Sequence, residues 1–144
     1  MEKQVKKNIL TLVQESRDAI ACSVDQNGFP NAKAMFIAKS DGIQKFWFST
    51  NTSAGRTKQW MEQPEACIYI LDADNIQGLM LIGTMTVLTD EETKEQFWNE
   101  GDEKYYSLGV TDPDYCIVCF TSKQGKYWEN QNYDLDEALI LQIK

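Results

Sequence analysis

The stretch FSTNTSAGRTKQW, residues 48–60, has the most evident chemical potential in the sequence. It runs from an aromatic strand into a short helix, and its loop carries four hydroxyl groups followed by Gly55, Arg56 and Lys58. Helix N-termini favour acidic residues because the peptide dipoles place partial positive charge there. This first turn carries two cations and no anion. The pattern therefore raises the question of whether an external anion binds to the helix start.

A helix start can bind phosphate because its first backbone N–H groups have no partner within the helix. Gly55 would let the anion approach closely, and the two cations would then have a partner. The alternative is that Thr52 or Ser53 simply caps the helix while Arg56 and Lys58 are solvated. Both interpretations remain open from this stretch alone.

Lys33 lies inside a strand, in the segment GFPNAKAMFIAK, between two alanines. A lone strand lysine usually faces solvent, but Lys33 reaches the same anion if its strand lies beside the helix start. Aromatic and methionine residues on nearby strands could pack against a ring, or could simply belong to the core; these are Met35, Phe36, Trp47, Phe48 and Trp128.

Composition limits the chemistry further. The chain has 144 residues and a net charge of −8, which disfavours nucleic acid as a partner. It contains no histidine, which removes histidine-based triads and most catalytic metal sites, so we expect no metal. Any chemistry must proceed without imidazole or be supplied by a bound cofactor.

The sequence also predicts a compartment. No run of apolar residues is long enough for a transmembrane helix, and the N-terminus lacks the apolar core of a signal peptide. The four cysteines lie in apolar segments and are interpreted as buried thiols rather than as a zinc or redox site. We therefore expect a cytoplasmic protein with no membrane partner.

Periodicity and turn signals predict a mainly β fold in one domain, residues 1–144. A helix is expected over 3–16 and another over 54–63, and hairpin turns at Asn27-Gly28 and Asp41-Gly42. Gly83 indicates a bulge or a close backbone approach. The expected strands of this part cover residues 19–25, 32–39, 44–50, 66–72 and 78–88.

Helical and strand segments alternate in the rest of the chain, residues 89–144. Thr89 and Glu92 form a capping-box pattern that predicts a helix over 90–99. The other elements expected are a short helix at 102–107, a hairpin over 115–130 with a turn near Gly125, and a final strand at 137–144. Strands predominate, so we expect an antiparallel barrel-like sheet flanked by helices.

Five segments follow one another in a specific order between about residues 25 and 130: NGFPNAKAMF, DGIQKFWFST, SAGRTKQWMEQPEACIYI, LMLIGTMTVLTDEETKEQFW and DPDYCIVCFTSKQGKYWEN. Together they resemble the FMN-binding split-barrel proteins, the pyridoxamine 5′-phosphate oxidase-like family, and most closely its general stress protein 26-like branch. The resemblance implies a six-stranded antiparallel split β-barrel that binds FMN. It also implies a homodimer with an FMN at each end of the interface.

The resemblance assigns cofactor-binding residues position by position. Lys33 and Arg56 stand where the family has its phosphate-binding Arg and Lys, with Gly55 and Lys58 beside Arg56. Ser49 and Thr50 match the strand end that lines the cofactor. The other positions implied are Ala34, Met35, Phe36 and Ile37, on the strand whose backbone faces the flavin ring, Gln77 and Gly78 at another strand end, and Trp128 from the partner chain.

By the same resemblance, the protein is expected to be a flavin-dependent oxidoreductase that uses a small-molecule electron donor. Because the FMN phosphate would occupy Lys33 and Arg56 and the net charge is −8, we expect a small neutral or weakly charged acceptor, such as a quinone or nitroaromatic, stacked on the flavin face near Trp128. True pyridoxamine phosphate oxidases hold their substrate with a C-terminal Arg and a His. This chain has no histidine and no arginine after Arg56, so we do not expect that activity. The alternatives are a non-catalytic flavin-binding or stress-associated module, a dimeric interaction domain without cofactor, and a relative that uses a deazaflavin.

Overall fold

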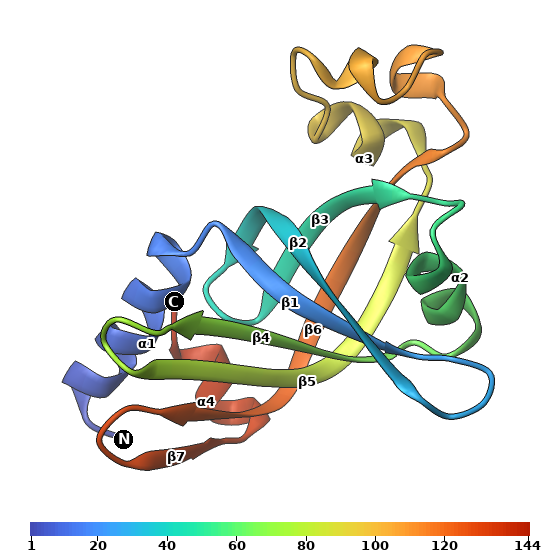
Figure 1. Cartoon of the computed structure of the whole chain (residues 1–144). Helices are drawn as coiled ribbons and strands as arrows, with labels where there is room; N and C mark the ends of the chain where they lie inside the picture. Colours follow the sequence, from blue (N-terminus) through green and yellow to red (C-terminus); the bar gives the residue numbers. More distant parts are fainter.

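The computed structural model describes residues 1–144 and is built around one antiparallel sheet with short helices at its ends (Figure 1). Its strands are β1 (Asp18–Val24), β2 (Pro30–Asp41), β3 (Lys45–Asn51), β4 (Glu65–Asp72), β5 (Gln77–Leu88), β6 (Tyr115–Trp128) and β7 (Asn132–Leu135). Its α-helices are α1 (Lys3–Glu15), α2 (Gly55–Glu62), α3 (Glu91–Gln96) and α4 (Glu137–Gln142), and two 3₁₀ turns cover η1 (Asp102–Lys104) and η2 (Gly109–Thr111). None of the helices combines the length and hydrophobicity needed to cross a lipid bilayer.

The sheet closes into a barrel. Its strand order is β3-β2-β1-β4-β5-β6-β7, and a further pairing of β3 with β6 joins the two sides. Six strands therefore form the closed barrel, and β7 extends it beyond β6. The predicted mainly β fold, a six-stranded antiparallel split barrel, is confirmed.

The barrel is open between β2 and β3. The two strands pair only from Ile37 to Asp41 on β2 and from Lys45 to Phe48 on β3. Residues 30–36 of β2 pair with β1 alone, and residues 49–51 of β3 pair with β6 alone. Both strands thus present one unpaired backbone edge to the opening, and α2 begins beside it.

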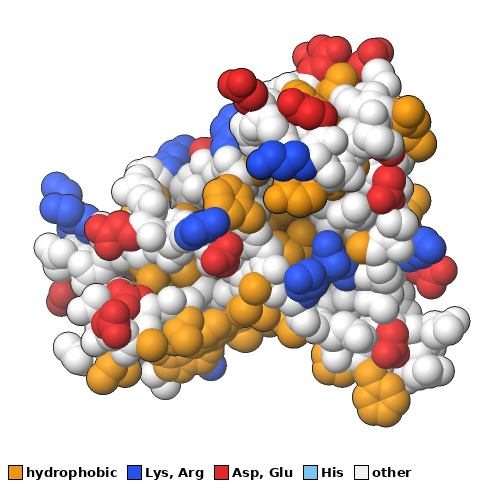
Figure 2. Space-filling model, turned by 45° about the horizontal axis from the view of Figure 1, so that its top comes forward, with side chains coloured by type: hydrophobic (Ala, Val, Ile, Leu, Met, Phe, Trp, Pro, Cys, Tyr) orange, Lys and Arg blue, Asp and Glu red, His pale blue; other side chains and the backbone are white.

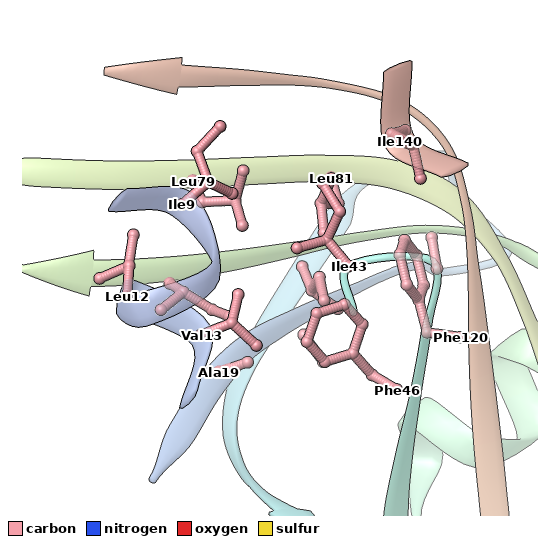
Figure 3. Close-up of a cluster of buried hydrophobic side chains, with 14 of the residues drawn as sticks. Ile9, Leu12, Val13, Ala19, Ile43, Phe46, Leu79, Leu81, Phe120 and Ile140 are labelled. Carbon is pink, nitrogen blue, oxygen red and sulfur yellow. The ribbon is translucent and has the colours of Figure 1, made fainter. Parts of the chain in front are cut away.

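The core fills the barrel and is covered at one end by α1. One face of this helix, formed by Val5, Ile9, Leu12 and Val13, is buried, with Ile9 fully inaccessible to solvent. Figure 3 shows Ile9, Leu12 and Val13 of α1 in one group with Ala19 and Leu79 of the barrel, with Ile140 of α4 above Phe120. Burial of such side chains is the main stabilising term in folding. The helices α1 and α4 therefore belong to the hydrophobic core and stabilise the barrel.

Two glycines lie where backbones approach closely. A Cβ on Gly83 would lie 1.9 Å from the carbonyl oxygen of Thr121, and the β5–β6 register shifts between Ile82 and Gly83. This confirms the prediction for Gly83. The predicted turn near Gly125 is wrong: β6 runs through Gly125 without a break, and a Cβ there would lie 2.4 Å from the carbonyl oxygen of Met80.

Three other local predictions are corrected. The segment 137–144 contains the helix α4 instead of a strand, because Asp136 caps it through the Leu139 N–H at 2.8 Å. The cap of α3 is Asp90, not a box of Thr89 and Glu92. The expected helix at 102–107 is only the 3₁₀ turn η1, Asp102–Lys104. Of the four free cysteines, Cys116 and Cys119 are buried as predicted, whereas Cys22 and Cys67 are only half-buried.

Candidate functional site

A cavity of about 190 Å³ lies where the barrel opens, between α2 and the β1–β2 hairpin. Lys33 of β2 lines it together with Gly55 and Arg56 of α2. The sequence left open whether this strand lies beside the helix start; in the structure it does. The remaining lining residues are small or polar: Ala21, Ser23, Asn31, Ala32 and Gln59.

Arg56 is held in place but not fully paired. Its Nη2 donates a hydrogen bond to Oγ1 of Thr50 at 2.7 Å, which fixes the guanidinium against β3. Its Nε is buried and has no partner, and the hydroxyl of the fully buried Thr57 also has none. Because an unpaired buried donor is costly, these two groups are suited to an external acceptor.

The start of α2 is also unpaired. Its N-cap residue is Ala54, no side chain caps the helix, and its first turn contains no acidic residue. The alternative in which Thr52 or Ser53 caps the helix is therefore wrong. The first N–H groups of α2, next to Gly55, are left for a ligand.

The polar groups of the loop before α2 form hydrogen bonds with Asp114 and not with the helix. Its carboxylate accepts hydrogen bonds from the Ser53 N–H at 2.8 Å and from the Asn51 side chain at 2.9 Å. The Thr52 hydroxyl lies 3.2 Å from the same carboxylate and donates to the Pro113 carbonyl at 2.9 Å. These hydrogen bonds, led by the one from Asn51, lower the pKa of Asp114 to about 2. The loop is thus fixed by a residue that the sequence shows only as part of the DPDY motif.

A second, larger cavity of about 1080 Å³ lies on the outside of β2 and β3, at the same opening. Phe36 and Ser49, both predicted cofactor residues, line it. Its opposite wall comes from the segment between β5 and β6, residues 89–114, here called the helical lobe. The lobe contributes Gln96, Phe97, Asn99, Asp102, Tyr105 and Tyr106. Sequence patterns did not predict this wall; the only signal is the aromatic and amide content of QFWNEGDEKYY.

The remaining predicted residues of β2 and α2 have different environments. Met35 is buried in the core and only its backbone lies at the strand edge, whereas Ala34 is exposed. The N–H of Ile37 donates to the Arg17 carbonyl at 3.0 Å. Lys58 is exposed and lines neither cavity.

Gln77, Gly78 and Trp128 form a separate group. Gly78 lies opposite Trp128 in the β5–β6 register, and the Gln77 side chain accepts a hydrogen bond from Tyr127 at 3.0 Å. The start of β5 lies at the end of the barrel near α1, whereas α2 lies at the other end (Figure 1). Within one chain these three residues are therefore not brought to the Arg56 cavity.

Comparison with known proteins agrees with the fold. A family model described as pyridoxamine 5′-phosphate oxidase like matches residues 4–143. No curated protein matches the chain in sequence. A Clostridium acetobutylicum crystal structure, of a protein related to general stress protein 26 of B. subtilis (pyridoxinephosphate oxidase family), is 37% identical with a TM-score of 0.87, covering 97% of this chain and 99% of that one.

More distant structures share the fold alone. General stress protein 26 from Bacillus anthracis is 18% identical, with a TM-score of 0.73 over 92% of this chain and 99% of that one. A pyridoxamine 5′-phosphate oxidase-related, FMN binding protein from Nostoc punctiforme is 13% identical, with a TM-score of 0.65 over 92% of this chain and 88% of that one. With the family model spanning almost the whole chain, the chain belongs to the pyridoxamine 5′-phosphate oxidase-like family.

Proposed function

We propose that the chain binds FMN, with the phosphate in the small cavity beside α2. The observation that carries this proposal is the buried, unpartnered Nε of Arg56, a residue that lines this cavity; the following residue of the helix, Thr57, also has a buried hydroxyl without a partner. Lys33 adds a second positive charge, and the uncapped start of α2 adds backbone N–H groups. The residues therefore fit a phosphate, and the FMN-binding relative from Nostoc supports this choice of cofactor.

The rest of the cofactor would lie along the opening between β2 and β3. The unpaired backbone edges of residues 30–36 and 49–51 supply hydrogen-bonding groups there, and Phe36 supplies an apolar surface. These groups are suited to the polar edge and flat face of a flavin ring. When bound, FMN supplies the two-electron redox chemistry, and the chain positions it and excludes water.

The nearby tyrosines do not serve as proton donors in this proposal. Burial raises the pKa of Tyr106 and that of Tyr115 to about 12. Their hydroxyls donate to the carbonyls of Thr50 and Lys94, at 3.1 and 2.8 Å. They therefore keep their protons at physiological pH and support the strand end and the helical lobe.

We infer that the reaction is flavin-dependent oxidation and reduction with a small neutral acceptor. Pyridoxamine 5′-phosphate is an unsuitable substrate because Lys33 and Arg56 are used by the cofactor phosphate, and no arginine follows Arg56. The net charge of −8 further disfavours a second phosphate. A module that binds flavin without turnover would share the phosphate cavity, and only kinetics separates the two.

The proposed assembly is a homodimer formed by an outer face of the barrel. This outer face consists of the outward-pointing, mainly apolar side chains Ile20, Cys22, Cys67, Tyr69, Leu71, Met80 and Ile82. Leu71 is 62% exposed and Ile82 37%, which is unusual for neighbouring strands of a monomer. Figure 2 shows hydrophobic side chains gathered along the barrel edge opposite the acidic helical lobe.

A two-fold axis would place the same patch of both copies together. The outer face continues through Gly78 to Trp128, which lies opposite it in the register. In the proposed dimer, Gln77, Gly78 and Trp128 of one copy would lie beside the cofactor of the other copy. Placement of these residues beside the flavin thus depends on the dimer.

Reconstitution tests the proposed function. Purified protein is titrated with FMN and its absorption spectrum recorded; saturation at one FMN per chain supports the binding site. The reconstituted protein is then mixed with NADH or NADPH and a neutral quinone. Turnover supports the oxidoreductase, binding without turnover supports the non-catalytic module, and absence of FMN binding overturns the proposal.

A further inference from the structure

The large cavity outside β2 and β3 has more room than the small phosphate cavity and a different chemistry. Its volume of about 1080 Å³ is in the range of small-molecule sites. Phe36, 58% exposed, and Tyr105, 76% exposed, come to it from opposite walls, β2 and the helical lobe. The Arg17 guanidinium lies over the Phe36 ring, 5.3 Å from its centroid, whereas the Tyr105 ring has no such partner. Tyr105 is therefore the large exposed ring that a ligand would cover.

The charged groups of this cavity already have partners within the chain. Only Lys39 and Asp102 carry charge among the lining residues. The ammonium of Lys39 lies over the Trp47 ring, 5.2 Å from its centroid, and Asp102 accepts a hydrogen bond from the Asn99 N–H at 2.8 Å. Because the two charges are opposite and both engaged, the cavity does not select a charged ligand.

Uncharged hydrogen-bonding groups remain free. The side-chain amides of Gln96 and Asn99 line the cavity and make no hydrogen bond to the rest of the chain. Each can donate to a carbonyl or nitro oxygen. The ring hydroxyl of Tyr106, in contrast, donates to the Thr50 carbonyl, so it leaves its ring and not its O–H for a ligand.

We propose that this cavity is the acceptor site, and that it binds a flat, uncharged molecule with acceptor oxygens, such as a quinone. Tyr105 contacts the face of its ring, and the amides of Gln96 and Asn99 donate to its oxygens, while Phe36 lies between this ligand and the flavin. The cavity shares Phe36 and Ser49 with the residues assigned to the flavin, so the ligand lies beside the cofactor. This assignment rests on the proposed function, and it replaces Trp128 by Tyr105 as the aromatic residue for the acceptor.

Calorimetric titration of the FMN-loaded protein tests the assignment without turnover. The neutral probe is 2,3-dimethyl-1,4-naphthoquinone, whose ring positions are fully substituted so that it does not add to the cysteines. The anionic probe is anthraquinone-2-sulfonate. We expect saturable binding of the neutral probe at one per chain and at least about tenfold weaker binding of the anionic one.

Two variants locate the site. Gln96→Glu removes the amide donors at nearly constant size and is expected to weaken the neutral probe about tenfold, the order of one lost hydrogen bond. The matched control is Gln131→Glu, the same change at an exposed position outside the cavity, which should leave binding unchanged. Tyr105→Ala should weaken binding similarly, and Tyr105→Phe should restore it, since the ring is what contacts the ligand.

The outcomes separate the two proposals. If FMN binds but the neutral quinone does not, or binds equally well to Gln96→Glu and Tyr105→Ala, the acceptor site is refuted while the proposed cofactor stands. Quinone binding to the FMN-free protein that disappears on FMN loading also refutes it, because the flavin then fills the cavity. If FMN itself does not bind, the proposed function fails irrespective of the quinone.

Discussion

At the scale of single residues, the phosphate cavity depends on groups that are buried without a partner. The Nε of Arg56 and the hydroxyl of Thr57 are the buried side-chain polar atoms without hydrogen bonds in this chain. Both belong to the first turn of a helix that no side chain caps. Arg56 lines the cavity, so its unpaired Nε is the reason to assign an anion there.

Thr57→Val tests the role of the unpartnered hydroxyl. Valine keeps the shape and removes an unsatisfied buried group, so the FMN-free variant should be as stable as the parent or slightly more so. FMN affinity should fall by about 0.5–1.5 kcal/mol, the net value of one hydrogen bond. Thermal unfolding and FMN titration measure the two effects. A variant that is destabilised while its FMN affinity is unchanged would show that the hydroxyl serves the fold only.

At the scale of elements, the site depends on the loop between β3 and α2, which Asp114 fixes from the start of β6. The hydrogen bonds of Asp114 favour its ionised form, which lowers its pKa to about 2 from an ordinary value of 3.8. A lowered pKa means that the unfolded chain takes up the proton first as pH falls. The stabilisation by Asp114 is therefore complete above about pH 4 and is lost as the pH approaches 2.

The variant Asp114→Asn tests whether the Asp114 carboxylate stabilises the fold by fixing this loop. The variant should unfold at a lower temperature than the parent at neutral pH, because the amide nitrogen cannot accept the bonds that the carboxylate accepts. The difference in melting temperature should narrow between pH 4 and pH 2, where the parent loses its charge as well. Melting curves across this range measure it. A difference that stays constant down to pH 2 would mean that Asp114 is not the anchor of the loop.

The elements also show what a sequence can and cannot predict here. Turns at Asn27-Gly28 and Asp41-Gly42 were predictable because Gly28 and Gly42 adopt positive φ, which glycine tolerates best. Gly125 is also a glycine, but it is needed for a different reason. It leaves room for the backbone of β5, which is distant in the sequence. The same limit applies to the site. Arg56 and its loop carry a local signal, whereas the cavity wall from the helical lobe arises only from tertiary packing.

At the scale of the whole molecule, the proposed site is incomplete in one chain. Lys33 and Arg56 lie at one end of the barrel, and Gln77 and Trp128 belong to a group near the other end. The exposed outer face between them is apolar, which favours association with a second copy. Assembly and cofactor binding are therefore expected to be linked.

Leu71→Glu tests this linkage. Both copies would place a carboxylate in the interface, so the dimer should dissociate to monomers at micromolar concentration, and FMN affinity should fall with it. Leu71 is 62% exposed, so the fold should persist. Leu108→Glu, at a residue 68% exposed on the helical lobe, is the matched control and should remain dimeric. Light scattering gives the mass, and a monomeric parent that still binds FMN tightly would exclude the shared site.

The most direct test of the central claim compares FMN with riboflavin, which lacks the phosphate, in the parent and in Arg56→Ala. If the cavity beside α2 holds the phosphate, Arg56→Ala weakens FMN by about 1.5–3 kcal/mol, the range for a charge-assisted hydrogen bond. Riboflavin affinity should hardly change, and Lys7→Ala, which removes an exposed charge from α1, should affect neither ligand. Equal losses for FMN and riboflavin in Arg56→Ala would contradict the assignment of the phosphate to this cavity.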